Sequence, residues 1–185
     1  MQARKSFFCA VLLTVVAIAI PPLLFADHEE GRNRHRERNR DRGHRASDLK
    51  PVANPAYQEH CGACHFAYQP ELLPSTSWKK IVDQLEDHFG ESFELDPEAQ
   101  KAVLTYLETN GAEHSTAKRA VKIMKSVGSS APMRITEIPY IRDKHRKVSK
   151  SVLDRSSIGS LSNCAACHRR AEQGNYDDGF VVIPE

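Results

Sequence analysis

Cys61-Gly62-Ala63-Cys64-His65 and Cys164-Ala165-Ala166-Cys167-His168 are two copies of one pentapeptide pattern, Cys-x-x-Cys-His. On a helix, two thiols with this spacing lie about one turn apart, so both can reach the vinyl groups of one porphyrin. The next side chain then lies beside the iron, and the pattern is the attachment signature of a c-type haem. Two copies predict two covalently bound haems. The predicted attachment residues are Cys61, Cys64, Cys164 and Cys167, and the predicted proximal ligands of the iron are His65 and His168.

A Cys-x-x-Cys pair alone also occurs in redox-active dithiols, zinc sites and short disulfides. The sequence has nine histidines among 185 residues, so chance does not explain a histidine directly after both pairs. The two pairs of a four-cysteine zinc site usually lie about 15–20 residues apart, and a far longer segment separates these two. The pattern therefore favours haem over the three alternatives.

Residues 1–26 have the outline of a secretory signal peptide. Arg4 and Lys5 precede an apolar stretch, and Ala26 stands before a very polar segment. Cleavage there would remove Cys9 and leave only the four motif cysteines. Export to the periplasm agrees with haem attachment, which bacteria carry out outside the cytoplasm. An uncleaved membrane anchor is the alternative, because the apolar stretch is just long enough to span a bilayer.

Residues 27–48 form an arginine- and histidine-rich arm with almost no apolar side chains. Such a segment cannot bury a core, so we expect it to be disordered. Its glutamates and aspartates dilute the positive charge, which favours a solvated spacer over an arm that contacts anionic lipid or an acidic redox partner. Nucleic acid is not an expected partner of an exported protein.

The remaining sequence predicts an all-α fold, mostly helical with irregular connectors. We expect two small c-type haem lobes, at residues 49–127 and 128–185, because residues 128–139 read as a connector rich in glycine, serine and proline. Asn54-Pro55 and Asp96-Pro97 predict helix starts. Apolar periodicity predicts a helix over residues 78–89, and only residues 180–183 suggest a strand.

The ligand on the second face of each iron decides the function, because an open face binds gas or peroxide and a filled face favours electron transfer. His88 continues an apolar stripe with Ile81 and Leu85, so it is the best internal candidate. Met133, in the connector, is a weaker one. Met124 reads more simply as a core residue of its helix.

His145 stands in a strongly charged segment, where a histidine is often only solvated. It nevertheless precedes His168 by the same number of residues by which His88 follows His65. The spacing suggests one distal histidine for each haem. It leaves open which histidine serves which haem.

Several segments resemble the small dihaem cytochrome c family of bacterial periplasms, over residues 51–185 as a whole. The segments are Phe66-Ala67-Tyr68, Leu72-Leu73-Pro74, Ser77-Trp78, Asp87-His88-Phe89-Gly90-Glu91, Arg134-Ile135-Thr136, His145-Arg146, Asn163 to His168 and Gly174 to Pro184. The resemblance implies a two-lobed helical electron carrier with His88 and His145 as distal ligands. It also implies redox protein partners, among them a small high-spin cytochrome that binds oxygen and a membrane b-type cytochrome.

The sequence therefore predicts electron transfer by a periplasmic protein that is not an enzyme. A dihaem peroxidase, a small-molecule reductase or a haem-based gas sensor would need one haem with an open distal face. No polar catalytic constellation for such a site can be read from the sequence.

Overall fold

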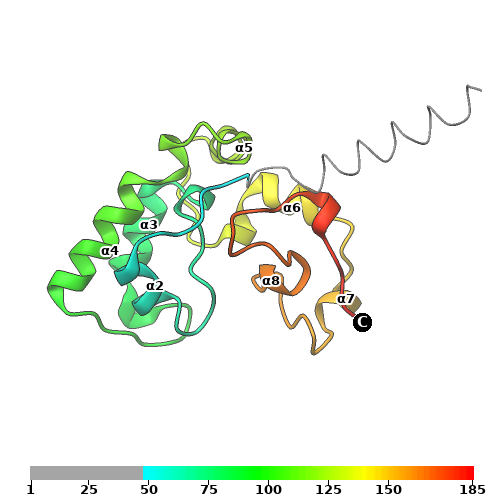
Figure 1. Cartoon of the computed structure of the whole chain (residues 1–185), viewed down its shortest axis with the longest axis horizontal. Helices are drawn as coiled ribbons and strands as arrows, with labels where there is room; N and C mark the ends of the chain where they lie inside the picture. Colours follow the sequence, from blue (N-terminus) through cyan, green and yellow to red (C-terminus); the bar gives the residue numbers. More distant parts are fainter. Residues whose placement is uncertain (1–47) are drawn as a thin grey trace, which may run out of the picture. The chain divides into compact units, whose positions relative to one another are not determined.

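The computed structural model describes residues 48–185, and the predicted signal peptide and nearly all of the predicted arm lie outside the described residues. The described part is helical, as predicted, and contains no strand (Figure 1). Within it, no helix is long and apolar enough to cross a membrane. Its α-helices are α2 (Pro55–Cys61), α3 (Ser75–Val82), α4 (Pro97–Thr109), α5 (Lys118–Val127), α6 (Pro139–His145), α7 (Lys150–Leu153) and α8 (Cys164–Cys167).

Both predicted cap-plus-proline helix starts are confirmed. The side chain of Asn54 accepts a hydrogen bond of 2.8 Å from Tyr57 N at the start of α2, which ends at Cys61 of the first motif. The side chain of Asp96 accepts from Glu98 N and Ala99 N at the start of α4. These caps satisfy backbone donors that a helix N-terminus leaves free.

The predicted helix over residues 78–89 is wrong beyond Val82, where α3 ends. The chain continues through a 3₁₀ turn, Leu85–Asp87, into the non-helical backbone of His88. Three carboxylates follow the end of α3, and negative charge is unfavourable at the C-terminal, negative end of a helix dipole. His88 therefore owes its position to a turn and not to a helical stripe.

The suggested strand at residues 180–183 is also wrong. The segment instead contains a 3₁₀ turn, Asp178–Phe180, followed by extended residues. Val181 forms an isolated bridge with His168, and Val182 N donates to Cys167 O at 2.9 Å. The C-terminal segment is thus held against the second motif by backbone hydrogen bonds, without a partner strand.

The buried apolar residues form one cluster that includes residues of both predicted lobes, from Leu49 to Tyr176. The fully buried Gln69 makes three hydrogen bonds to the C-terminal part of the chain, the longest of them from Nε2 to Glu172 O at 3.3 Å. Its Nε2 donates to Ala171 O at 2.7 Å, and its Oε1 accepts from the Tyr176 hydroxyl at 2.6 Å. Such buried hydrogen bonds fix the two segments to one another, because an unpaired amide would be costly there. The division into two lobes stays a prediction.

Gly174 lies where the start of the described chain contacts its C-terminal part. Leu49 N donates to Gly174 O at 2.9 Å, and the glycine has a φ of 74°. A Cβ added at this position would lie 2.3 Å from Leu49 O. Both the positive φ and the close approach therefore require glycine here.

We expect Gly174→Ala to lower the free energy of unfolding by about 1–3 kcal/mol more than Gly159→Ala, because only the first substitution forces a clash. Gly159 is a matched control, since its φ is 76° but a Cβ there would meet nothing within 4 Å. Guanidinium unfolding of the holoprotein, followed by circular dichroism, measures both. Equal losses for the two variants would contradict the role given to the Leu49 contact.

Candidate haem sites

Two cavities contain the residues that the sequence predicted as haem ligands. The first has a volume of about 610 Å³ and the second about 540 Å³. Both lie within the range of about 300–1,000 Å³ that is typical of cofactor pockets. The first is lined by Cys61, Cys64, His65 and His88, and the second by Cys164, Cys167, His168 and His145.

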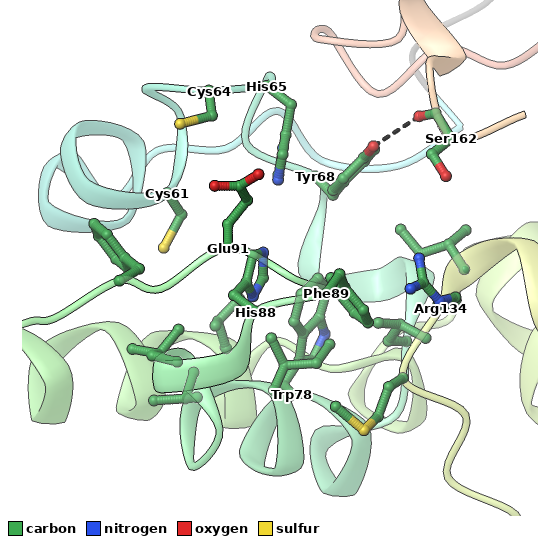
Figure 2. Close-up of a pocket in the computed structure, with 18 of the residues that line it drawn as sticks. Cys61, Cys64, His65, Tyr68, Trp78, His88, Phe89, Glu91, Arg134 and Ser162 are labelled. Atoms are coloured by element: carbon green, nitrogen blue, oxygen red, sulfur yellow. Dashed lines mark hydrogen bonds between the residues drawn. The ribbon is translucent and has the colours of Figure 1, made fainter. Parts of the chain in front are cut away.

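In the first cavity, the attachment motif faces the turn that follows α3. Cys61 ends α2, and His65 points from the next loop toward His88 (Figure 2). His65 Nδ1 lies 2.9 Å from Phe66 O, so the ring can donate there and leave Nε2 free for a metal. Trp78 is buried beside the cavity, and its Nε1 donates to Pro70 O at 2.7 Å.

A tight turn holds His88 in place. His88 N donates to Glu91 O at 2.7 Å, and Glu91 N donates back to His88 O at 3.3 Å. The two residues between them, Phe89 and Gly90, have φ values of 59° and 101°. A positive φ is strained for a bulky side chain, and the Arg134 guanidinium lies 4.1 Å from the centre of the Phe89 ring. The turn thus fixes the backbone of His88 at some cost in strain.

In the second cavity, α8 carries both cysteines and His168 follows its last residue. His145 is the last residue of α6, and its Nδ1 lies 2.8 Å from Ile141 O in the same helix. This contact orients the His145 ring as the Phe66 carbonyl orients His65. The ring of Tyr176 lies 5.4 Å from that of His168, centre to centre.

The spacing of the two histidine rings in each cavity suits one iron between them. The ring centres are 6.4 Å apart for His65 and His88, and 6.0 Å apart for His145 and His168. A metal bound by two imidazoles at about 2 Å from each nitrogen, with about 1.2 Å from nitrogen to ring centre, needs roughly 6.4 Å. Each cavity therefore pairs histidines from its own half of the chain, and the residues present fit a haem at both sites.

Burial favours the neutral form of one imidazole in each cavity, His88 in the first and His168 in the second. Desolvation is the main cause that lowers the pKa of His88, with the neighbouring His65 and Arg134 adding to it. Desolvation, followed by His145 and Arg119, lowers the pKa of His168 to about 4. A neutral imidazole has the free lone pair that a metal ligand needs.

Burial also raises the pKa of Cys61 and of Cys164 to about 11. These two thiols therefore stay protonated near neutral pH. Redox-active dithiols depend on thiolates with a lowered pKa. The buried environment of the two cysteines is therefore unlike that of a redox-active dithiol.

The remaining histidines of the described residues, His60 and His114, and the two methionines have different positions. His60 and Met133 line the first cavity together with His88, so both are near enough to be compared with it by experiment. Met124 packs against the core and His114 is exposed, and neither lines either of the two cavities.

Several residues join the two sites through positions and contacts that the sequence did not predict. Ile135, Thr136 and Cys164 line both cavities, so a wall of shared residues separates them. Tyr68, three residues after the first motif, lines the first cavity and donates from its hydroxyl to Ser162 O at 2.7 Å. This contact joins residues far apart in the sequence, and no local pattern could have revealed it.

Two cavities of this kind, each with an attachment motif and a facing pair of histidines, define a c-type cytochrome with two haems. The family model for dihaem cytochrome c matches residues 57–176. The chain belongs to this family, and its cofactors are two c-type haems with iron.

Solved structures agree with this assignment. A dihaem cytochrome c from Rhodobacter sphaeroides is 39% identical, with a TM-score of 0.61, and the match covers 69% of this chain and 100% of that chain. A dihaem cytochrome c from Shewanella baltica is 32% identical, with a TM-score of 0.58, over 71% of this chain and 93% of that chain. No curated protein matches the sequence. The predicted family, helical fold and cofactors are thus confirmed.

We expect the double variant Cys164→Ala, Cys167→Ala to retain one covalent haem, at the first motif, and Cys61→Ala, Cys64→Ala to retain one at the second. Each pair of thiols should hold its own porphyrin, because both cysteines of each pair line one cavity together with their own histidine pair, although Cys164 also contacts the first cavity. Mass spectrometry of the denatured variants measures the number of haems attached. Two covalent haems in either variant would contradict the assignment.

Proposed function

We propose that this protein carries single electrons in the periplasm, through two haems that each have two histidine ligands. The observation that carries the proposal is the facing pair of rings in each cavity, 6.4 Å and 6.0 Å apart. When bound, the haems supply the one-electron chemistry, and the protein supplies ligands, burial and spacing.

The side chains around each iron position have separate tasks in this proposal. His65 and His145 are oriented by the carbonyls of Phe66 and Ile141, which leaves Nε2 of each ring for the iron. His88 and His168 complete the two pairs. With both faces filled, neither site offers a place for peroxide or a gas, which separates a carrier from the enzyme and sensor alternatives.

The shared wall supports transfer between the two haems. Ile135, Thr136 and Cys164 belong to both cavities, so no further layer of protein intervenes at these residues. An electron that enters at one site can therefore pass to the other within the molecule. Its external donors and acceptors are redox proteins, and a small high-spin cytochrome and a membrane b-type cytochrome are the partners that the family resemblance suggests.

The periplasmic location is part of the same proposal. Covalent haem attachment outside the cytoplasm and the signal-like sequence of residues 1–26 support it. That signal and nearly all of the arginine- and histidine-rich arm lie outside the described residues, so their roles stay predictions.

We expect the oxidised holoprotein to be entirely low-spin in optical and low-temperature electron paramagnetic resonance (EPR) spectra, and its reduced form not to bind carbon monoxide. His88→Ala and His145→Ala should each turn about half of the iron high-spin, because each removes one ligand from one haem. The same variants should bind carbon monoxide at one haem.

His60→Ala, Met133→Leu and His114→Ala are the controls. The first two residues line the first cavity and the third lines neither, and all three variants should remain low-spin. A substantial high-spin signal in the unmodified protein, or unchanged spectra in both His88→Ala and His145→Ala, would contradict the bis-histidine carrier.

A further inference from the structure

We infer that the second haem, attached at Cys164 and Cys167, has a higher reduction potential than the first. A single electron on the protein then resides mainly on the second haem, and the internal direction of transfer is from the first site to the second. The inference rests on the proposed bis-histidine ligation and adds an order to it. Three differences between the cavities carry it: the hydrogen bonds of the ring nitrogens, the access of water and the charge of the walls.

The first difference concerns the ring nitrogens that do not face the iron. Donation from Nδ1 makes an imidazole a more basic ligand, which stabilises ferric iron and lowers the potential. In the first cavity, His65 has Phe66 O as acceptor and the partly exposed His88 can donate to water. In the second, His145 has an acceptor, but His168 Nδ1 is buried and has no partner among residues 48–185. The second iron therefore has the weaker pair of ligands.

Water reaches the two motifs to different extents. Cys64 and His65 are exposed, whereas Cys164, Cys167 and His168 are all only partly exposed. The ferric state carries one more positive charge than the ferrous state, and poor hydration disfavours that charge. Burial thus also favours the reduced form at the second site.

The charge of the walls differs in the same direction. The charged residues that line the first cavity are Glu91 and Arg134, which balance. The second cavity is lined by four cations and two carboxylates. They are Arg119, Lys144, Arg146, Lys147, Asp143 and Asp178. Both haems carry the same peripheral carboxylates, so the difference between the walls persists when the haems are bound, and the second wall disfavours ferric iron more.

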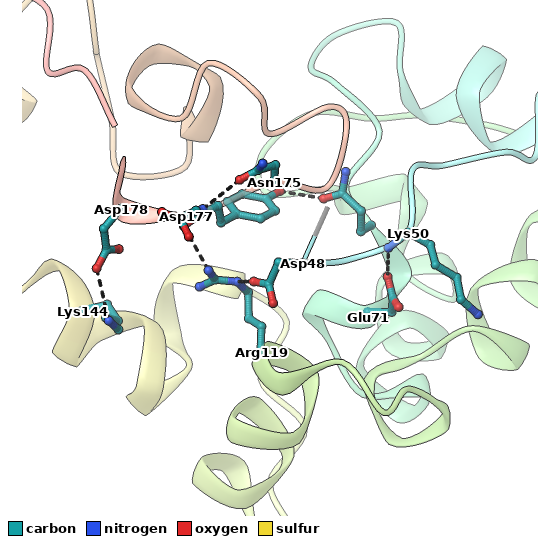
Figure 3. Close-up of polar contacts among 10 residues, drawn as sticks. Asp48, Lys50, Glu71, Arg119, Lys144, Asn175, Asp177 and Asp178 are labelled. Carbon is teal, nitrogen blue, oxygen red and sulfur yellow. Dashed lines mark hydrogen bonds and ion pairs between the residues drawn. The ribbon is translucent and has the colours of Figure 1, made fainter. Parts of the chain in front are cut away.

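Ion pairs remove part of this excess but not all of it. Three of the four cations have carboxylate partners. Arg119 pairs with Asp48 and Lys144 with Asp178, as Figure 3 shows. Arg146 pairs with Asp143. Lys147 has no ion pair within the described part of the chain, so it leaves an unbalanced positive charge at the second cavity.

The segment that carries His88 has the opposite charge. Residues 83–98 hold seven carboxylates and no lysine or arginine, and five of the seven remain when Glu91, already counted in the cavity wall, and Asp83, paired with Lys79, are set aside. Negative charge near an iron stabilises its ferric state. This segment therefore lowers the potential of the first haem while Lys147 raises that of the second.

The ring planes make the two haems distinguishable in one sample. The planes of His65 and His88 differ by 21°, and those of His145 and His168 by 70°. Nearly parallel axial rings split the two iron orbitals that interact with them and give a rhombic low-spin EPR spectrum. Nearly perpendicular rings leave these orbitals close in energy and give a strongly anisotropic low-spin EPR spectrum. We therefore assign the anisotropic signal to the second haem, and His88→Ala checks this assignment by removing the rhombic signal.

The test is a redox titration of the full holoprotein, followed by EPR. We expect the anisotropic signal to disappear first as the potential is lowered, with an equilibrium constant for transfer to the second haem of at least about ten, which is about 59 mV for one electron. Loss of the rhombic signal first, or loss of both together, would overturn the inference and leave the bis-histidine carrier intact. A high-spin ferric signal in the unmodified protein would instead overturn the ligation and the inference with it.

Lys147→Glu tests the contribution of charge. This exposed residue lines the second cavity, so the variant should lower the potential of the second haem and reduce the equilibrium constant severalfold, with a smaller change at the first. Lys101→Glu is the matched control, because Lys101 is exposed on α4 and lines neither cavity. The role of the wall charge would be overturned if both variants lowered the potential of the second haem by the same amount relative to the first. It would also be overturned if Lys147→Glu left both potentials unchanged.

Discussion

The spacing of two imidazole rings across each cavity is the constraint on which the rest of the structure depends. His65 lies in a loop and His88 follows a turn, whereas His145 is the last residue of one short helix and His168 follows another. The ring centres of the two pairs are nevertheless almost equally far apart. A metal accepts only a narrow range of ligand distances. Because α3 ends at Val82 and the chain makes a strained turn at Phe89, the ring of His88 lies at 6.4 Å from that of His65.

Local chemistry was readable in the sequence, and long-range geometry was not. Asn54 and Asp96 cap their helices as predicted, because a cap depends only on a side chain and the next few backbone amides. Apolar periodicity predicts a helix that includes His88, but α3 ends at Val82, before three carboxylates whose charge is unfavourable at a helix C-terminus. His88 lines the first cavity because a turn, and not a helix, places it there.

The pairing of histidines and the joining of the two sites could not be read from the sequence. Equal spacing along the chain leaves the pairing open, whereas the cavities bring His88 together with His65 and His145 together with His168. Tyr68 and Gln69 reach segments about a hundred residues away, at Ser162 and Ala171. Contacts of this kind depend on the folded backbone and have no local signature.

Cys164 lies in the walls of both cavities, and this has a consequence for how the protein matures. The residue that anchors one cofactor is also part of the enclosure of the other. The first cavity therefore gains its complete wall only when the C-terminal motif has taken its place beside it. A chain that stops before the second motif would therefore lack Cys164 in the wall of its first cavity.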